Sequence, residues 1–242
     1  MSAAEKWVTT PDALVAAVAE GIGKIVVSGR LSNVPSLHLS PGQSLCGAAE
    51  DSKITFADGA DGMELTSDNG IHNVYLRASP ERRAIFNDAS VAGLGRIQLS
   101  GVTTHGRVQI LARDKVRGGH VDVNGLDIVA ADARGERERP HGYGVSVLHG
   151  AFTLWNMQRN EDVALSADLV GISAGRQGAP VRGSGVFVGG AGDTGGRLIV
   201  RRLETGPVHS DGGIAAGTPD RISGGVFVLY GAFADSVRNV AP

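Results

Sequence analysis

Cysteine is almost absent from this sequence, which has a single one, Cys46, among 242 residues. One cysteine excludes an intrachain disulfide and any metal site built from clustered cysteines. No apolar run approaches the roughly 18 residues that span a bilayer, and residues 1–6 lack the basic and apolar regions of a secretory signal. We therefore expect no membrane association and, for the chain as given, a cytoplasmic location; a secreted protein whose signal had been removed would also fit.

An excess of charge of one sign is lacking as well. The 23 Lys and Arg residues nearly balance the 25 Asp and Glu residues, and no block of like charges forms a basic arm. A nucleic-acid partner is therefore not expected. No HExxH or paired CxxC spacing occurs, so we predict no metal site, and no cofactor is evident; a role for calcium would have no motif behind it.

Glycine is abundant, at 36 residues, and it separates short runs in which apolar and polar residues alternate. Alternation with a period of two predicts β-strands. The runs lie at residues 25–27, 37–39, 54–56, 97–99, 108–110, 121–123, 126–128 and 145–147.

An internal repeat then distinguishes a solenoid from a sandwich or barrel. Residues 144–152 (GVSVLHGAF) recur as 185–192 (GVFVGGAG) and as 225–233 (GVFVLYGAF), about 40 residues apart. Further strand-like runs at 163–172 and 198–203 fall between the copies, which predicts a coil of about 20 residues.

A single helix is predicted, near the start of the chain. Thr10 is a suitable N-cap, Pro11 suits the first helical position, Leu14 and Val18 share an apolar face, and Gly21 can end the helix. We expect residues 1–23 to cover one end of the solenoid and residues 24–242 to form its coils, as a single domain.

The passages TPDALVAAVAEGIGKIVVSGRLS and SLHLSPGQSLCGAAEDSKITF resemble the opening of pectate-lyase-like (pectin-lyase-fold) proteins, over roughly residues 7–56. The resemblance implies an all-β fold, a single-stranded right-handed parallel β-helix with a short N-terminal capping helix. Proteins of that architecture include lyases and hydrolases of acidic polysaccharides. The signature passages of polygalacturonases and pectate lyases are missing here, so no catalytic residue is carried over by position.

The far end of the chain stops shortly after the third repeat copy, without an evident cap. Either the chain is a fragment of a longer protein or this end is buried against another subunit. In the second case we expect a homo-oligomer that forms through the C-terminal end or the side of the solenoid.

Chemistry is most concentrated in three loops, at 132–143, 173–184 and 204–221, each of which precedes one repeat copy. We expect the loops to emerge on one side, in alternate coils, and to form a groove for an oligosaccharide or small molecule. The candidate catalytic residues are Asp132, Glu138, His209 and Asp211. The candidate substrate-binding residues are Arg134, Glu136, His141, Tyr143, Arg176 and Arg182.

Two simpler interpretations remain open for these loops. Residues 136–139 alternate in sign and would also be satisfied as a solvated, salt-bridged loop. His209 and Asp211 would equally suit a turn, because Asp bonds readily to nearby backbone.

The favoured function is a carbohydrate-active enzyme, a lyase or hydrolase of an acidic oligosaccharide. The alternatives are a non-catalytic β-helical scaffold or glycan-binding module, and an isomerase or cyclase of a small molecule in the same groove. Fold resemblance alone does not decide between catalysis and binding.

Overall fold

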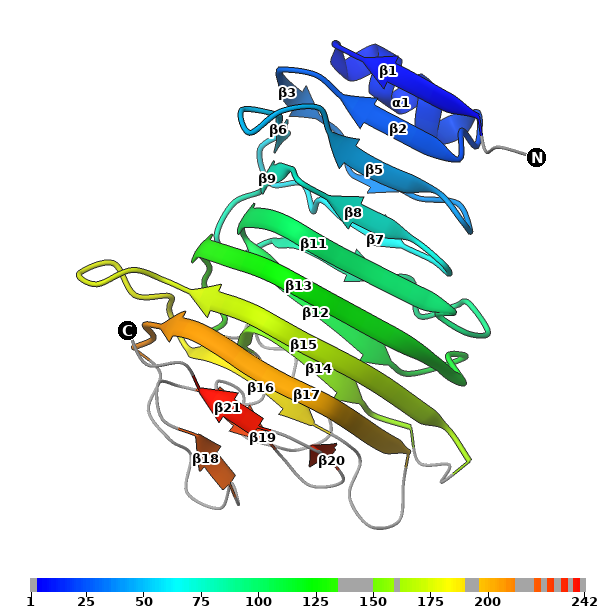
Figure 1. Ribbon diagram of the computed structural model, residues 1–242. Coiled ribbons are helices and arrows are strands. Elements are labelled where there is room, and N and C mark those ends of the chain that lie inside the picture. Colours follow the sequence, from blue (N-terminus) through cyan, green and yellow to red (C-terminus); the bar gives the residue numbers. More distant parts are fainter. Residues whose placement is uncertain are drawn as a thin grey trace.

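The computed structural model describes residues 4–134, 150–158, 162–189 and 196–211 in full, and residues 220–222, 226–228, 232–234 and 237–239 by their backbone alone. Two sheets contain almost all of the described secondary structure (Figure 1). Sheet A has thirteen strands and sheet B has eight. The all-β class expected from the sequence is confirmed.

Sheet A has a main path and four further strands. The main path runs through β1 (Glu5–Val8), β2 (Lys24–Val27), β5 (Ser44–Gly47), β8 (Gly70–His72), β11 (Arg96–His105), β13 (Gly118–Ala130), β15 (Ala164–Ala174), β17 (Arg197–Val208) and β20 (Ala232–Ala234). Beside it lie β3 (Arg30–Val34), β6 (Lys53–Phe56), β9 (Tyr75–Arg77) and β21 (Val237–Asn239).

Sheet B comprises β4 (Leu37–His38), β7 (Met63–Leu65), β10 (Arg83–Asn87), β12 (Arg107–Ala112), β14 (Gly150–Asn156), β16 (Ser184–Gly189), β19 (Val226–Val228) and β18 (Asp220–Ile222). From β10 to β17 the chain visits the two sheets in turn, and each new strand lies parallel to the strand of the previous visit. Both sheets therefore grow in one direction, from the N-terminal to the C-terminal strands (Figure 1). The antiparallel pair in the described part is β18 with β19.

The core is a set of apolar stacks between the two sheets. Because side chains alternate along a strand, parallel pairing in register aligns every second residue with its equivalent in the next coil. One stack in sheet A is fully buried and consists of Leu45, Ile71, Leu99, Val123, Leu169 and Leu203. Sheet B faces it with Leu37, Met63, Ile85, Val108, Phe152 and Val186. This burial of aliphatic side chains is the main stabilising contribution.

The N-terminal helix is α1 (Pro11–Ala19), with the cap that the sequence predicts. The Thr10 hydroxyl accepts a hydrogen bond from the Ala13 N–H at 3.2 Å, Pro11 starts the helix, and Gly21 adopts a positive φ after its end. Leu14 and Val18 are buried against the end of the core. The strand β1, which precedes the helix and extends sheet A, was not foreseen from the sequence.

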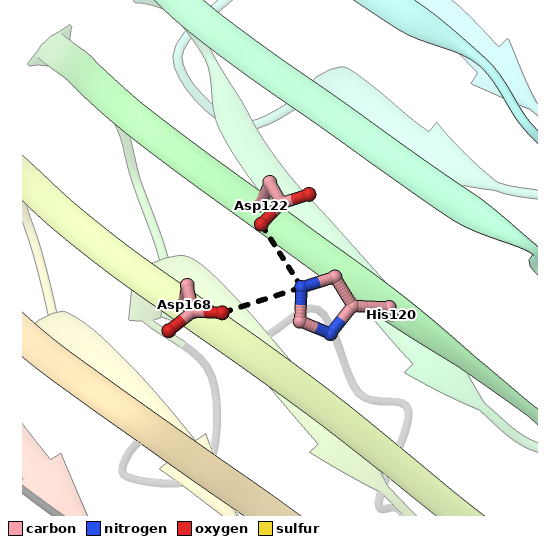
Figure 2. A group of neighbouring side chains, drawn as sticks. All are labelled: His120, Asp122 and Asp168. Atoms are coloured by element: carbon pink, nitrogen blue, oxygen red, sulfur yellow. Dashed lines mark hydrogen bonds and ion pairs between the residues drawn. The ribbon is translucent and has the colours of Figure 1, made fainter.

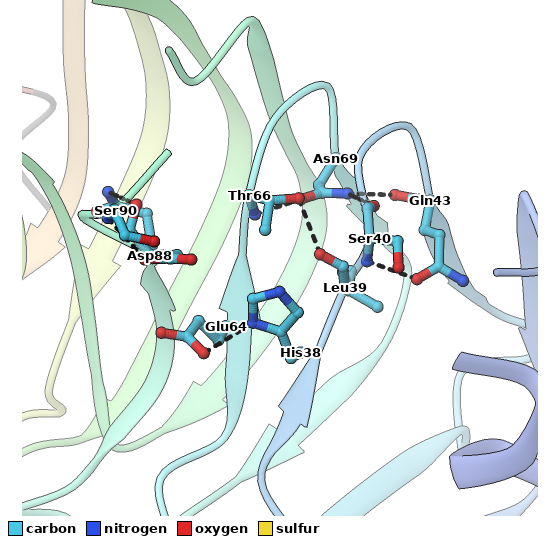
Figure 3. Close-up of polar contacts among 10 residues, drawn as sticks. His38, Leu39, Ser40, Gln43, Glu64, Thr66, Asn69, Asp88 and Ser90 are labelled. Carbon is cyan, nitrogen blue, oxygen red and sulfur yellow. Dashed lines mark hydrogen bonds and ion pairs between the residues drawn. The ribbon is translucent and has the colours of Figure 1, made fainter. Parts of the chain in front are cut away.

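The corner between sheet B and sheet A is held by buried amides. The Gln43 side chain donates to the carbonyls of Val18 and Ile22. It also accepts a hydrogen bond from the Ser40 N–H (Figure 3). Asn69, one coil later, donates to the carbonyls of Ser40 and Gln43, so the two amides join successive coils (Figure 3). Buried backbone groups at these corners, which no strand can pair, are thereby satisfied.

Long sheet A strands bend at a stack of residues in the left-handed region. Gly101, Gly125 and Gly171 have φ of 59°, 77° and 68°, and Asn73 has φ of 49°. Glycine is favoured at position 101 by this φ, and an added Cβ would lie 2.4 Å from the Asn73 Oδ1 and displace that side chain. The bend divides β13 into a first half, up to Asn124, and a second half that leads out of the sheet after Ala130.

The repeat period expected from the sequence is wrong in the C-terminal half. β14, β16 and β19 are immediate neighbours in sheet B, so the repeat copies belong to consecutive coils and not to alternate ones. Val186 pairs with Val226, 40 residues later, whereas Met63 pairs with Ile85 after 22. The three loops predicted at 132–143, 173–184 and 204–221 account for the longer spacing between paired strands in this half of the chain. The first copy also differs: Phe152 pairs with Val186, and residues 144–149 lie outside the described part.

Candidate functional site

Three segments from consecutive coils lie side by side on the route from sheet A to sheet B. We call residues 131–134, 181–183 and 209–211 the ledge. Asp132 and Arg182 form a parallel β-bridge, and so do Val181 and Ser210. The Arg182 N–H donates to the Ala131 carbonyl at 2.9 Å and its carbonyl accepts from the Ala133 N–H at 2.7 Å. The expected convergence of the three loops therefore holds for these described residues.

Asp132 is engaged by a guanidinium within the ledge. Arg134 donates through Nε to Asp132 Oδ1 at 3.0 Å and through Nη2 to Oδ2 at 2.8 Å. These hydrogen bonds, helped by the charge of nearby Arg182, hold the pKa of the Asp132 carboxyl below its ordinary value despite partial burial. The same contact raises the pKa of Arg134. Asp132 is therefore ionised at neutral pH and is poorly suited to donate a proton.

Asp211 and His209 take part in the backbone framework of the ledge. Asp211 Oδ1 accepts a hydrogen bond from the Gly183 N–H at 2.7 Å. The His209 N–H donates to the Ala174 carbonyl, and its carbonyl accepts from the Val181 N–H. These contacts agree with the turn-shaping interpretation of both residues, and His209 as a residue is half-buried.

The arginines differ in what they contact. Arg182 is exposed and, within the described part of the chain, makes no side-chain hydrogen bond or ion pair. Arg176 turns away from the ledge, because its guanidinium pairs with the Asp127 carboxylate of β13 at 2.9 and 2.5 Å. The structure thus brings Asp132, Arg134, Arg182, His209 and Asp211 together and assigns Arg176 to an ion pair on the face of sheet A. Glu136, Glu138, His141 and Tyr143 lie outside the described residues.

A second group of side chains lies on the outer face of sheet A, where the sequence analysis proposed nothing. His120 and Asp122 alternate with buried residues on β13, so both point outward. Asp168 of β15 is the register partner of Asp122. His120 Nε2 lies 2.9 Å from Asp122 Oδ1 and 3.4 Å from Asp168 Oδ2 (Figure 2). We call these three residues the sheet-face cluster.

Two neighbours hold the sheet-face cluster in place. His120 Nδ1 lies 2.7 Å from the Ser166 Oγ, and Ser166 is the register partner of His120 on β15. Arg96 of β11 donates through Nε to Asp122 Oδ2 at 2.5 Å. The cluster is partly exposed, at 21% for the His120 side chain, 22% for Asp122 and 36% for Asp168.

The signal for this cluster in the sequence is weak. The segment His120-Val121-Asp122-Val123 shows two polar residues on one face of a strand, but Asp168 joins them through a pairing between coils. That pairing depends on where the chain returns to sheet A after an insertion, which the sequence alone does not specify.

Comparisons of this chain with protein-family models, with curated proteins and with solved structures find no match. The resemblance of residues 7–56 to pectate-lyase-like proteins therefore rests on the sequence passages alone. None of the helices in the described part of the chain is long and apolar enough to cross a membrane.

Proposed function

We propose that this chain is a right-handed parallel β-helix and a carbohydrate-active enzyme, a lyase or hydrolase, that binds an acidic oligosaccharide at the ledge. Support for the β-helix comes from the parallel order of both sheets, since crossovers between parallel strands of one sheet are almost always right-handed. Support for a polymeric ligand comes from the ledge itself, which three consecutive coils extend along the solenoid.

The observation that carries the preference for an acidic ligand is the state of Arg182. The Arg134 charge is matched by Asp132 through two hydrogen bonds, whereas the Arg182 guanidinium is exposed and unpaired among the described residues. A planar guanidinium is suited to bind a carboxylate with two hydrogen bonds. A uronate sugar would supply that carboxylate, and His209, whose backbone bonds to the neighbouring Val181, is proposed to contact the same ligand.

The two aspartates of the ledge are assigned to its structure and not to the acid–base chemistry. Asp132 and Asp211 accept hydrogen bonds that fix the ledge, so we assign them structural roles beside the ligand. Glu138 and His209 then remain the proposed acid–base residues for elimination or hydrolysis. A lyase would remove the proton next to a uronate carboxylate, and a hydrolase would protonate the glycosidic oxygen.

A thermal-shift and calorimetric titration with oligogalacturonate, and with a neutral oligosaccharide of equal length, tests the binding. We expect the acidic ligand alone to raise the melting temperature, because it binds the native state. Arg182→Ala should weaken binding by about tenfold, the loss expected for a hydrogen bond to a charged group. Arg30→Ala is the matched control, since Arg30 is exposed on β3, several strands away. Equal binding by both variants would contradict the proposal.

Mass spectrometry of the products tests the reaction. A lyase yields an unsaturated fragment without uptake of water, and a hydrolase yields fragments that contain one added water. We expect Glu138→Ala to abolish product formation while oligogalacturonate binding persists. Binding without any product from the wild-type chain would instead identify a glycan-binding module.

The second candidate is the non-catalytic scaffold, and the Asp132–Arg134 pair favours it. Charges that satisfy each other within the ledge need no ligand. A scaffold would also be expected to self-associate through its C-terminal end or its side. Size-exclusion chromatography with light scattering distinguishes it: a homo-oligomer that ignores every oligosaccharide supports the scaffold, and a monomer that binds oligogalacturonate supports the first proposal.

A further inference from the structure

The donor atoms of the sheet-face cluster, His120, Asp122 and Asp168, are of mixed chemistry. One imidazole nitrogen and two carboxylate oxygens lie within 4.8 Å of one another. Imidazole nitrogen suits zinc and other first-row transition metals, whereas a site for calcium or magnesium is built from oxygen alone. The donor set therefore selects a class of ion.

The spacing of the atoms matches that class. A tetrahedral Zn²⁺ with bonds of about 2.0–2.1 Å needs ligand atoms about 3.3 Å apart. His120 Nε2 lies 2.9 Å from Asp122 Oδ1 and 3.4 Å from Asp168 Oδ2. The two nitrogen–oxygen distances bracket that value, and all three donor atoms lie within 4.8 Å of one another.

The neighbours of the cluster occupy the other polar atoms of its ligands. Ser166 Oγ lies 2.7 Å from His120 Nδ1 and 3.5 Å from the Gly119 carbonyl, so its hydroxyl can donate to that carbonyl and accept from Nδ1–H. Nε2 faces the two carboxylates (Figure 2), and in this tautomer it presents its lone pair to them. Arg96 engages Asp122 Oδ2 and leaves Oδ1 for an ion. Such outer contacts are characteristic of metal ligands.

Charge favours a cation at the same point. With His120 neutral, the two carboxylates and Arg96 leave one negative charge in the cluster, and two electron-rich atoms face each other at 2.9 Å. Either a proton on Nε2 or a metal ion must lie between them. A proton on Nε2 serves one carboxylate well, whereas a metal ion would engage Asp122 and Asp168 together.

We propose that His120, Asp122 and Asp168 form a binding site for one divalent transition-metal ion of the Zn²⁺ class. Three protein ligands leave a coordination position open, and the partly exposed face of the sheet lets water or a ligand reach it. The site lies on the first half of β13, whereas the ledge begins after the end of that strand. The proposal does not depend on the function assigned to the ledge.

Isothermal titration calorimetry with Zn²⁺ tests it, using the full chain without an affinity tag after treatment with chelator. We expect one Zn²⁺ per chain and much weaker binding of Ca²⁺. His120→Ala and Asp168→Asn should each weaken Zn²⁺ binding at least about tenfold, and Ser166→Ala, which keeps all three ligands, about tenfold. His38→Ala is the matched control, because His38 pairs with Glu64 at 2.9 Å on an exposed face of sheet B without a third ligand among the described residues.

Substitution with Co²⁺ gives a second measurement, since its visible absorption reports the ligands directly. We expect a spectrum that His120→Ala changes and His38→Ala leaves alone, in variants whose circular dichroism matches the wild type. Unchanged Zn²⁺ affinity in both His120→Ala and Asp168→Asn would overturn the proposal. So would Ca²⁺ binding as tight as Zn²⁺ binding and insensitive to His120→Ala, which would identify a purely acidic surface.

Discussion

Asp132 and Arg182 are partners in a parallel β-bridge although they belong to different coils of the chain. Their backbones, and not their side chains, make the contact: the Arg182 N–H and carbonyl bond to residues 131 and 133. The two side chains are therefore held at a fixed spacing, with the Asp132 carboxylate bound to Arg134 and the exposed Arg182 side chain available to a ligand. Any change that separates these backbones should affect both charges together.

Gly183→Ala is expected to disturb the ledge. Gly183 has φ of 82°, and an added Cβ would lie 3.1 Å from both the Ala133 carbonyl carbon and the Arg134 nitrogen. We predict a loss of about 2–4 kcal/mol in the free energy of unfolding, from left-handed strain and close contact with backbone. Urea unfolding followed by circular dichroism measures it.

Gly178→Ala is the matched control for that substitution. Gly178 has φ of 79°, but nothing lies within 4 Å of its added Cβ. It should cost about 1–2 kcal/mol from strain alone. If Gly183→Ala and Gly178→Ala lower the free energy of unfolding equally, the close approach of the backbone at Gly183 does not add to the cost of the substitution.

Acid is expected to weaken the pair of Asp61 and Arg83. Burial alone would raise the pKa of the Asp61 carboxyl, but the hydrogen bonds and charge of Arg83 outweigh it and place the pKa below the ordinary 3.8. A carboxyl with a lowered folded-state pKa stabilises the fold above its unfolded pKa, and this contribution is lost as the pH falls through the folded-state pKa. We predict a loss of stability below about pH 4.

Asp61→Asn should separate this pair from other acid effects. It should lower stability at pH 7 by about 1–3 kcal/mol and make stability less dependent on pH below 4. Urea unfolding across a pH series checks both effects, with Asp51→Asn on the exposed surface as the control. An Asp61→Asn variant that is as stable as the wild type at pH 7 would rule out a stabilising role for the pair.

Asn69→Ala is expected to weaken the corner between the sheets. The Asn69 amide is buried, accepts from the Thr66 N–H at 2.7 Å and donates to two carbonyls of the preceding corner (Figure 3). Its removal leaves the buried Thr66 N–H without its acceptor and takes one of two donors from each carbonyl, at a cost of about 2–3 kcal/mol. Gln98→Ala, at an exposed position of β11, should change stability by less than about 0.5 kcal/mol. Equal thermal stability of the two variants would show that the corner amides are dispensable.

The sequence was informative about the fold where local signals are strong. Alternating runs such as 97–99 and 121–123 form strands, and the Thr10 cap and Pro11 start the helix. The period failed because Val186 and Val226 contribute the strong repeat signal, and their spacing contains an inserted loop. A repeat gives the distance between equivalent strands, not how many strands lie between them.

The part of the candidate site that could be predicted is the part that depends only on the order of loops and strands along the chain. Loops placed before equivalent strands must emerge together, and Asp132, Arg182 and Asp211 do so. Local sequence did not indicate the contact of Arg176, whose long side chain reaches back to Asp127 on the neighbouring strand. His120 and Asp168 were missed, since their meeting depends on a register between coils that local sequence does not determine.

Hydrogen exchange of the native chain with and without saturating oligogalacturonate tests the central claim most directly, because it reports each segment of the ledge separately. We predict slower exchange in all three segments, 131–134, 181–183 and 209–211, with no change along β1 to β6 at the N-terminal end of the sheets. Slower exchange confined to a single segment, or located away from the ledge, would contradict a ligand surface shared by three consecutive coils.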